Sequence, residues 1–211
     1  PKDVAYMAGL QIGQQVGGRM FDMMSQRIFG NDSTQSLSKE NFLAGFMAAL
    51  QKKGMNVTME EANAYVQSKA KAIKTKATEA QFAENKAAGE KFLAENAKKE
   101  GVKTTSSGLQ YKIIKEGNGA VPTDSSKVKV NYKGTLIDGT QFDSSYDRKE
   151  PTTFRANQVI KGWTEALTMM PVGSKWELYI PQDLAYGARE AGQIKPFSTL
   201  IFEVELVGIE K

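Results

Sequence analysis

The sequence predicts an α+β protein in which helices come first and an antiparallel β-sheet wrapped around a short helix follows. Two observations lead to this prediction. Up to about residue 100, apolar residues recur at helical spacing or give way to long runs of Ala, Lys, Glu and Gln. From residue 101 to residue 211, short alternations of apolar and polar residues end at turn signals such as Asn-Gly and Asp-Gly.

The composition excludes several classes of chemistry. The 211 residues include neither Cys nor His. This removes disulfides, thiolate metal sites, Cys nucleophiles, Ser-His triads and almost all zinc or iron sites. We therefore expect no metal and no cofactor.

The charge pattern and the hydropathy restrict the partners. The net charge is +4, but Lys and Arg alternate with Glu and Asp throughout, so the basic stripe typical of nucleic-acid binding is missing. No apolar run approaches the ~20 residues that span a bilayer. The chain starts at Pro1, which indicates a processed or trimmed form. In one interpretation, an export signal has been removed from it. With the pI near 9.1 and the lack of Cys, this favours the periplasm or cell envelope, the alternative being the cytoplasm.

The first region, residues 1–57, is predicted to be a helical dimerisation domain. An approximate helical stripe runs along it through Tyr6, Leu10, Val16, Met20, Met24 and Ile28. Gly9, Gly13 and Gly17 recur on one face, and because Gly costs up to ~1 kcal/mol in a helix relative to Ala, they indicate close approach of another backbone. That backbone belongs either to a partner chain or to this chain.

A second helix is predicted from Ser38, a favourable N-cap, to a stop at Gly54. Two short helices are too few to bury the Met and Phe side chains of this region by themselves. Dimerisation through these helices would cover them.

The second region, residues 58–100, is predicted to be a long connecting helix. Thr58 and Glu61 have the spacing of a capping box, and a continuous helix of this length would extend about 60 Å at 1.5 Å per residue. Its large apolar residues are too sparse for a sustained heptad seam. A solvated, spacer-like helix is therefore favoured over a coiled coil.

The third region, residues 101–211, is predicted to hold the sheet. A short helix is expected over 163–169, ending before Pro171. Within this region, residues 128–163 are dense in aromatic rings, which suggests a site for an apolar ligand with a few directed hydrogen bonds. The predicted strands are 109–115, 127–136, 141–142, 152–154, 175–180 and 200–209.

Five motifs of this region resemble the FKBP-type peptidyl-prolyl isomerases and occur in that family's order. They are 134–145 (GTLIDGTQFDSS), 158–163 (QVIKGW), 170–174 (MPVGS), 184–187 (LAYG) and 198–206 (STLIFEVEL).

The sequence upstream resembles the macrophage-infectivity-potentiator-like bacterial branch of that family. The resemblance rests on Asn85-Lys86, Gly89, Phe92-Leu93, Asn96, Gly101-Val102 and 107–111 (SGLQY). It implies a homodimer formed by the N-terminal helices, with a long helix carrying each isomerase domain, here 101–211.

The resemblance also implies a proline pocket. Tyr132, Asp143 and Tyr186 would take part in catalysis, Trp163 would form the floor, and the Ile160 N–H and the Tyr186 hydroxyl would bind substrate carbonyls. The substrate-binding residues would be Phe142, Phe154, Val159, Ile160, Trp163, Ile194 and Phe202. Macrolides such as rapamycin are expected inhibitors, although Phe197 and a shorter loop between Tyr186 and Phe202 depart from the family's pattern.

The expected activity is acceleration of X-Pro isomerisation in unfolded or partly folded polypeptides, together with chaperone activity. The alternative is a holdase chaperone whose isomerase activity is incidental, for which flexible Met side chains are suited. A scaffold with an inactive isomerase domain is disfavoured, because every pocket position keeps a residue compatible with the family.

Overall fold

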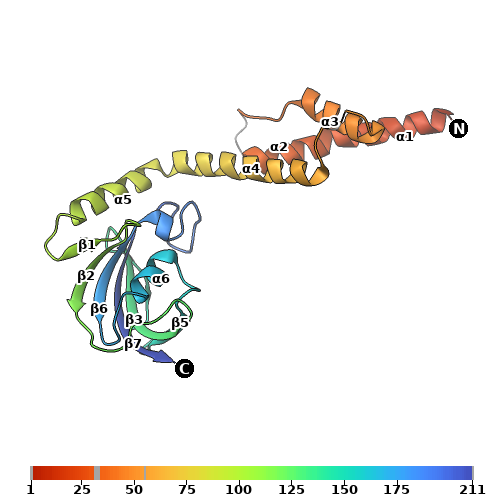
Figure 1. Cartoon of the computed structure of the whole chain (residues 1–211). Helices are drawn as coiled ribbons and strands as arrows, with labels where there is room; N and C mark the ends of the chain where they lie inside the picture. The colour runs from red at the N-terminus through yellow and green to blue at the C-terminus, as the bar shows by residue number, and fades with distance from the viewer. Residues whose placement is uncertain (1, 31–33, 55, 211) are drawn as a thin grey trace. The chain divides into compact units, whose positions relative to one another are not determined.

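The computed structural model describes residues 2–30, 34–54 and 56–210. The chain divides into two compact units, Pro1–Ala77 and Thr78–Lys211. Figure 1 labels most helices and strands of both units along the chain. In the described ranges, no helix combines the length and the apolar character needed to cross a membrane.

The first unit is helical, as expected. Its first helices are α1 (Lys2–Gln15), a π-helical turn (Val16–Met20), α2 (Phe21–Phe29) and α3 (Lys39–Gln51). The Ser38 hydroxyl accepts a hydrogen bond from the Asn41 N–H at 3.2 Å, which confirms the predicted N-cap. The predicted stop at Gly54 is too late, because α3 ends at Gln51 and Lys52 already has a left-handed backbone (φ 52°).

Most apolar side chains of the first unit remain exposed within the single chain. Val16 and Phe21 are buried, and the Phe21 ring meets the Phe42 ring edge-on at 5.3 Å. In contrast, Met7 and Leu10 are 61% and 52% exposed.

The glycine face of α1 is also open. A Cβ added at Gly9 or Gly13 would meet no atom within 4 Å, whereas at Gly17 it would approach Lys39 and Leu43 at 3.9–4.0 Å. Contacts at 3.9–4.0 Å are ordinary van der Waals contacts, so packing within one chain requires a glycine at none of these three positions.

The predicted long helix consists of two helices. α4 (Met59–Gln81) begins with the predicted capping box: Thr58 N–H donates to Glu61 Oε2 at 2.7 Å, and Glu61 N–H donates to Thr58 Oγ1 at 3.2 Å. Phe82, at φ −112°, then separates α4 from α5 (Ala83–Asn96).

The prediction of a solvated spacer is wrong for α5, because this helix packs on the sheet. Gly89 and Asn96 are buried. The Gln110 side chain donates to the Leu93 carbonyl and accepts from Asn96, both at 2.9 Å. The ring of Phe92 lies 6.1 Å from that of Tyr179.

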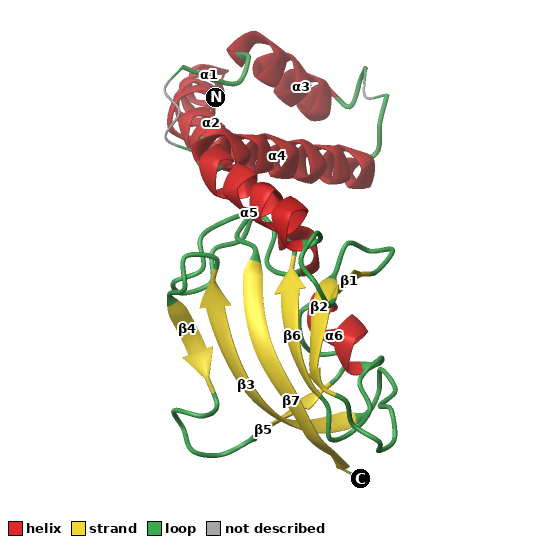
Figure 2. Cartoon of the chain, turned by 90° about the vertical axis from the view of Figure 1, so that its left-hand side faces the viewer, coloured by secondary structure: helices red, strands yellow, loops and turns green. Residues whose placement is uncertain are grey.

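The second unit is built on an antiparallel sheet that, in the described chain, has seven strands in the order β1-β2-β6-β7-β3-β4, with β5 paired to β3. Figure 2 shows the curved sheet with α6 (Lys161–Leu167) against it. The strands are β1 (Val102–Thr104), β2 (Gln110–Lys115), β3 (Lys127–Leu136), β4 (Gln141–Ser144), β5 (Thr152–Arg155), β6 (Lys175–Ile180) and β7 (Leu200–Glu210).

The core lies between α6 and the inner face of the sheet. Leu167 and Met170 are fully or almost fully buried, as are Val130, Leu178 and Leu206 on the strands. Gly162 admits this close packing, because a Cβ there would lie 2.5 Å from Ile180 Cγ2. All the predicted strands are present, and only β1 was not expected. The helix predicted over 163–169 both begins and ends two residues earlier, at Lys161 and Leu167.

Candidate active site

A cavity of about 850 Å³ opens between α6, the sheet and the segment that follows β6. Every residue that the sequence analysis assigned to the pocket lines this cavity. They are Tyr132, Phe142, Asp143, Phe154, Val159, Ile160, Trp163, Tyr186, Ile194 and Phe202. The structure thus brings together residues from segments far apart in the sequence, while the chemical role of each remains a prediction.

The floor of the cavity is a cluster of aromatic rings around Trp163, which is only 4% exposed. The rings of Tyr132 and Phe202 each lie 5.2 Å from the Trp163 ring and that of Phe154 lies 5.7 Å away, all nearly perpendicular to it. Edge-to-face geometry is favourable for aromatic pairs. The cluster therefore fixes a rigid apolar surface at the base of the cavity.

A glycine on β3 allows this cluster to close. A Cβ at Gly134 would lie 2.6 Å from Phe142 Cε2 and 2.7 Å from Phe202 Cε1. The Phe142 and Phe202 rings meet edge-on at 5.4 Å beside it. Any larger residue at this position would push one wall of the cavity outward.

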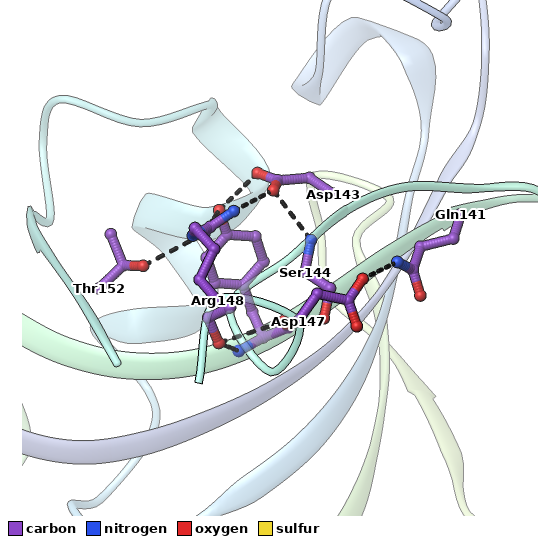
Figure 3. A network of polar contacts seen from close by, with 8 residues as sticks. Gln141, Asp143, Ser144, Asp147, Arg148 and Thr152 are labelled. Atoms are coloured by element: carbon purple, nitrogen blue, oxygen red, sulfur yellow. Dashed lines mark hydrogen bonds and ion pairs between the residues drawn. The ribbon is translucent and has the colours of Figure 1, made fainter. Parts of the chain in front are cut away.

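One side of the cavity carries a polar network, shown in Figure 3. The Tyr132 hydroxyl donates to Asp143 Oδ2 at 2.5 Å. Arg148 donates from Nη1 to Asp143 Oδ1 at 2.6 Å and from Nη2 to the Tyr132 hydroxyl at 2.8 Å. Asp143 Oδ1 also accepts from the Ser144 N–H at 2.8 Å. Both oxygens of the carboxylate are thus occupied by donors from the protein.

The network shifts the pKa values of its members. Burial alone would raise the pKa of Asp143, but hydrogen bonds from Tyr132 and Arg148 outweigh it and hold that pKa below its ordinary value. The hydrogen bond to Asp143 raises the pKa of Arg148. Burial, followed by the hydrogen bond to Asp143, raises the pKa of Tyr132. At neutral pH the site therefore holds an ionised carboxylate and a neutral phenol.

Two other residues of the lining supply polar groups that have no hydrogen-bond partner among the described residues. Ile160 is the N-cap of α6, and Tyr186 follows the short 3₁₀ helix Gln182–Leu184. In the part of the chain that the structure describes, neither the Ile160 N–H nor the Tyr186 hydroxyl has a hydrogen-bond partner. Both are thus free to bind polar groups of a ligand that lies on Trp163.

Sequence reasoning missed several residues of the site. Arg148 was not predicted, because it stands among charged residues that resemble an exposed turn. The only feature of the sequence that links it to the site is its position five residues after Asp143. The additional residues that line the cavity are Gln158, Lys161, Asp183, Ala185, Gly187, Arg189 and Ala191.

Phe197, which the sequence analysis named as a departure from the family's pattern, does not line the cavity. Its side chain is 5% exposed and its backbone is left-handed, at φ 60°. The Phe197 N–H donates to the Gly187 carbonyl at 2.7 Å. Phe197 is therefore joined through its backbone to a residue that lines the cavity beside Tyr186.

Two family models match this chain. A model described as FKBP-type peptidyl-prolyl cis-trans isomerase matches residues 119–207. A model described as the domain amino terminal to FKBP-type peptidyl-prolyl isomerase matches residues 1–113.

Individual proteins match over most of the length. The FKBP-type 22 kDa peptidyl-prolyl cis-trans isomerase of Escherichia coli K12 is 47% identical over 209 residues, which are 97% of this chain and 93% of that protein. The outer membrane protein MIP of Legionella longbeachae is 54% identical over 129 residues, 61% of this chain and 55% of that protein. The crystal structure of FkpA from Escherichia coli matches with a TM-score of 0.61 at 38% identity, covering 99% of this chain and 95% of that one.

Proposed function

Because the chain belongs to the family of FKBP-type peptidyl-prolyl cis-trans isomerases, we propose that its aromatic cavity binds proline in polypeptides and accelerates rotation about the preceding peptide bond. The observation that carries this proposal is a pair of polar groups around a cavity floored by Trp163: the Ile160 N–H and the Tyr186 hydroxyl, neither of which has a hydrogen-bond partner in the described ranges. The substrates are unfolded or partly folded chains, in which X-Pro bonds are accessible.

The physical problem is the double-bond character of the peptide bond. Rotation meets a barrier of ~18–20 kcal/mol, and X-Pro bonds exchange only over tens to hundreds of seconds although cis and trans differ by about 1 kcal/mol. The planar amide is more dipolar than the twisted transition state. The apolar floor of the cavity therefore disfavours the planar form relative to the twisted one, and no covalent step is needed.

The polar groups supply orientation. The Ile160 N–H and the Tyr186 hydroxyl hold carbonyls of the substrate on either side of the bond that rotates, while the proline ring lies on Trp163. Fixing the substrate in this way lowers the entropic part of the barrier.

Asp143 has a mainly structural and electrostatic role in this proposal. Its carboxylate accepts hydrogen bonds from Tyr132, Arg148 and the Ser144 N–H, which supports a group that fixes neighbouring side chains. A buried or half-buried carboxylate needs such partners. A proton transfer by Asp143 is not required for rotation.

The first test is a steady-state isomerase assay on a short proline peptide with the full chain. Replacing Tyr186→Phe is expected to lower kcat/KM roughly tenfold, the effect of one lost hydrogen bond. Tyr111→Phe is the matched control, because Tyr111 stacks on Trp176 at 4.6 Å and does not line the cavity. Equal kcat/KM values for the two variants would contradict the role of Tyr186.

Rapamycin, which competes for the same cavity, is expected to inhibit the unchanged chain.

The first unit supports an additional holdase function for a homodimer. Met20 and Met23 are 54% and 59% exposed in the single chain, and flexible Met side chains adapt to varied apolar partners. In the homodimer, the open glycine face of α1 packs against the partner chain and part of this apolar surface remains available to client proteins.

We place the protein in the bacterial periplasm or cell envelope. The support is its similarity to a protein named as an outer membrane protein in Legionella longbeachae. Fractionation of the bacterium that makes it tests this proposal, and recovery in the cytoplasmic fraction would contradict it.

A further inference from the structure

α5 contacts the segment that closes the cavity, although no residue of α5 lines the cavity. The Asn85 side-chain amide donates from Nδ2 to the Pro196 carbonyl at 2.7 Å and to the Ser198 hydroxyl at 3.0 Å. The Ser198 hydroxyl in turn donates to the Lys195 carbonyl at 2.8 Å. One amide on the helix thus ties together the segment just before β7.

Two further contacts hold the same segment against the helix. Gly89 is buried one turn after Asn85, and a Cβ there would overlap the Thr199 hydroxyl and lie 3.2 Å from Thr199 Cβ. The Lys86 ammonium lies 5.7 Å from the centre of the Phe197 ring, in a cation–π arrangement. Each of the four residues 196–199 is therefore in contact with α5.

The segment in turn sets the backbone of the cavity wall. The Phe197 N–H donates to the carbonyl of Gly187, which lines the cavity next to Tyr186. Ile194, two residues before Pro196, exchanges backbone hydrogen bonds with Ala191, both at 2.9 Å. Displacing residues 196–199 would therefore move the residues that face the ligand.

We propose that α5 is a positioning element of the active site: Asn85 and Gly89 hold residues 196–199, and through Phe197 and Gly187 they set the position of Tyr186 and Ile194. The inference rests on the proposed function, because it concerns binding in that cavity. Residues 185–199 contain little regular secondary structure, and ordering such a segment in advance removes an entropic cost that binding would otherwise carry.

The test compares two asparagines of α5 in the full chain. Asn85→Ala removes the amide that holds Pro196 and Ser198. Asn96→Ala is the matched control, because Asn96 is fully buried on the same helix but bonds to Gln110, away from this segment. Asn85→Ala removes two neutral hydrogen bonds that act on the cavity only indirectly, and it is expected to raise KM roughly three- to tenfold with little change in kcat. Asn96→Ala is expected to lower Tm while KM stays within about twofold.

Two more variants, together with a control at Gly45, guard against a simple folding defect. Ser198→Ala removes one of the two acceptors and is expected to raise KM less than Asn85→Ala does. Gly89→Ala presses on Thr199 and is expected to raise KM, whereas Gly45→Ala, where a Cβ meets nothing within 4 Å, is not. Identical KM values for the Asn85 and Asn96 variants would overturn the inference.

Hydrogen exchange separates this inference from the proposed function. If the unchanged chain were inactive, the proposed function would fail, but the exchange rate of the Phe197 amide would still report on the contact. We expect this amide to exchange faster in Asn85→Ala than in Asn96→Ala. Equal protection in the two variants would overturn the positioning role of α5 whatever the activity.

Discussion

Arg148 joins two side chains of the cavity wall that come from different strands. It donates to Asp143 on β4 and to the Tyr132 hydroxyl on β3, and its Nη2 also lies 3.3 Å from the Thr152 hydroxyl. Its ion pair with Asp143 is 43% and 42% exposed on the two sides. Such an exposed pair contributes little to stability, so its main effect is to orient Tyr132 and to keep Asp143 ionised.

The network gives a prediction about acid titration. The pKa of folded Asp143 lies below its ordinary value of 3.8, so its contribution to stability is present above that value and is lost as the pH falls through the folded pKa. Arg148→Met is expected to raise the pKa of folded Asp143 toward its ordinary value. The free energy of unfolding should then fall less between pH 7 and pH 3 than it does in the unchanged chain. An NMR titration of the Asp143 carboxyl carbon and urea unfolding at both pH values measure the two effects.

Arg155→Met serves as the control for that experiment. Arg155 lies on β5 in the same unit and forms no ion pair within the described residues. Its replacement is expected to leave the Asp143 titration unchanged. An unaltered Asp143 pKa in Arg148→Met would contradict the account of the network.

At the scale of residues, the sequence could identify the lining of the cavity because the motifs carry it. Trp163 and Tyr186 stand in short stretches with recognisable spacing. Arg148 could not be identified in the same way, since one positive charge in an exposed turn looks like any other. Only the fold brings its guanidinium to Asp143 and Tyr132.

At the scale of elements, α4 and α5 show why some of the fold could not be read from the sequence. Both are rich in Ala, Lys and Glu, yet α4 has no buried residue and α5 buries Gly89 and Asn96 against the sheet. Helix propensity is the same in either environment, so tertiary contacts decide. Gly89 is the one residue in the sequence of α5 that indicates packing against another element, because a glycine inside a helix is unfavourable unless close packing requires it.

Most strands could be predicted because alternation and turn residues mark them. The Asp138-Gly139 turn is a clear case: Gly139 has φ 87°, and Asp138 Oδ1 accepts from the Thr140 N–H at 2.9 Å. The unexpected strand β1 is only three residues long and has no fully buried residue. It forms by pairing with β2, not by a pattern of its own.

The glycine face of α1 gives a prediction about assembly. In an isolated chain, Gly9→Ala and Gly13→Ala together should stabilise the helix by up to ~1 kcal/mol at each site, because the added Cβ atoms would meet no other atom within 4 Å. In the proposed homodimer the added methyl groups would separate the two chains. We expect the dimer dissociation constant to rise at least about tenfold, as measured by sedimentation equilibrium over a concentration series.

Gly45→Ala is the control for assembly, because a Cβ on α3 at this position also meets nothing within 4 Å and Gly45 lies outside the glycine face. It is expected to leave the dissociation constant unchanged. A chain that stays monomeric at every concentration would contradict the proposed homodimer. An unaltered constant in the double α1 variant would place the interface elsewhere.

At the scale of the whole molecule, the two compact units have different surfaces. The unit Thr78–Lys211 encloses the aromatic core and the cavity, whereas the unit Pro1–Ala77 leaves large apolar side chains exposed. The expected domain boundary at residue 101 would leave α5 outside the isomerase domain. The contacts of Asn85 and Gly89 make this helix part of the unit that holds the cavity.

The most direct test of the central claim is NMR exchange spectroscopy on a short proline peptide with the full chain. Uncatalysed exchange between cis and trans takes tens to hundreds of seconds. We predict that a small molar fraction of the protein brings exchange into the range of seconds or faster, leaves the cis-to-trans ratio unchanged, and loses this effect in rapamycin. Peptide signals that shift on binding while exchange stays at the uncatalysed rate would contradict the account, and would favour a holdase.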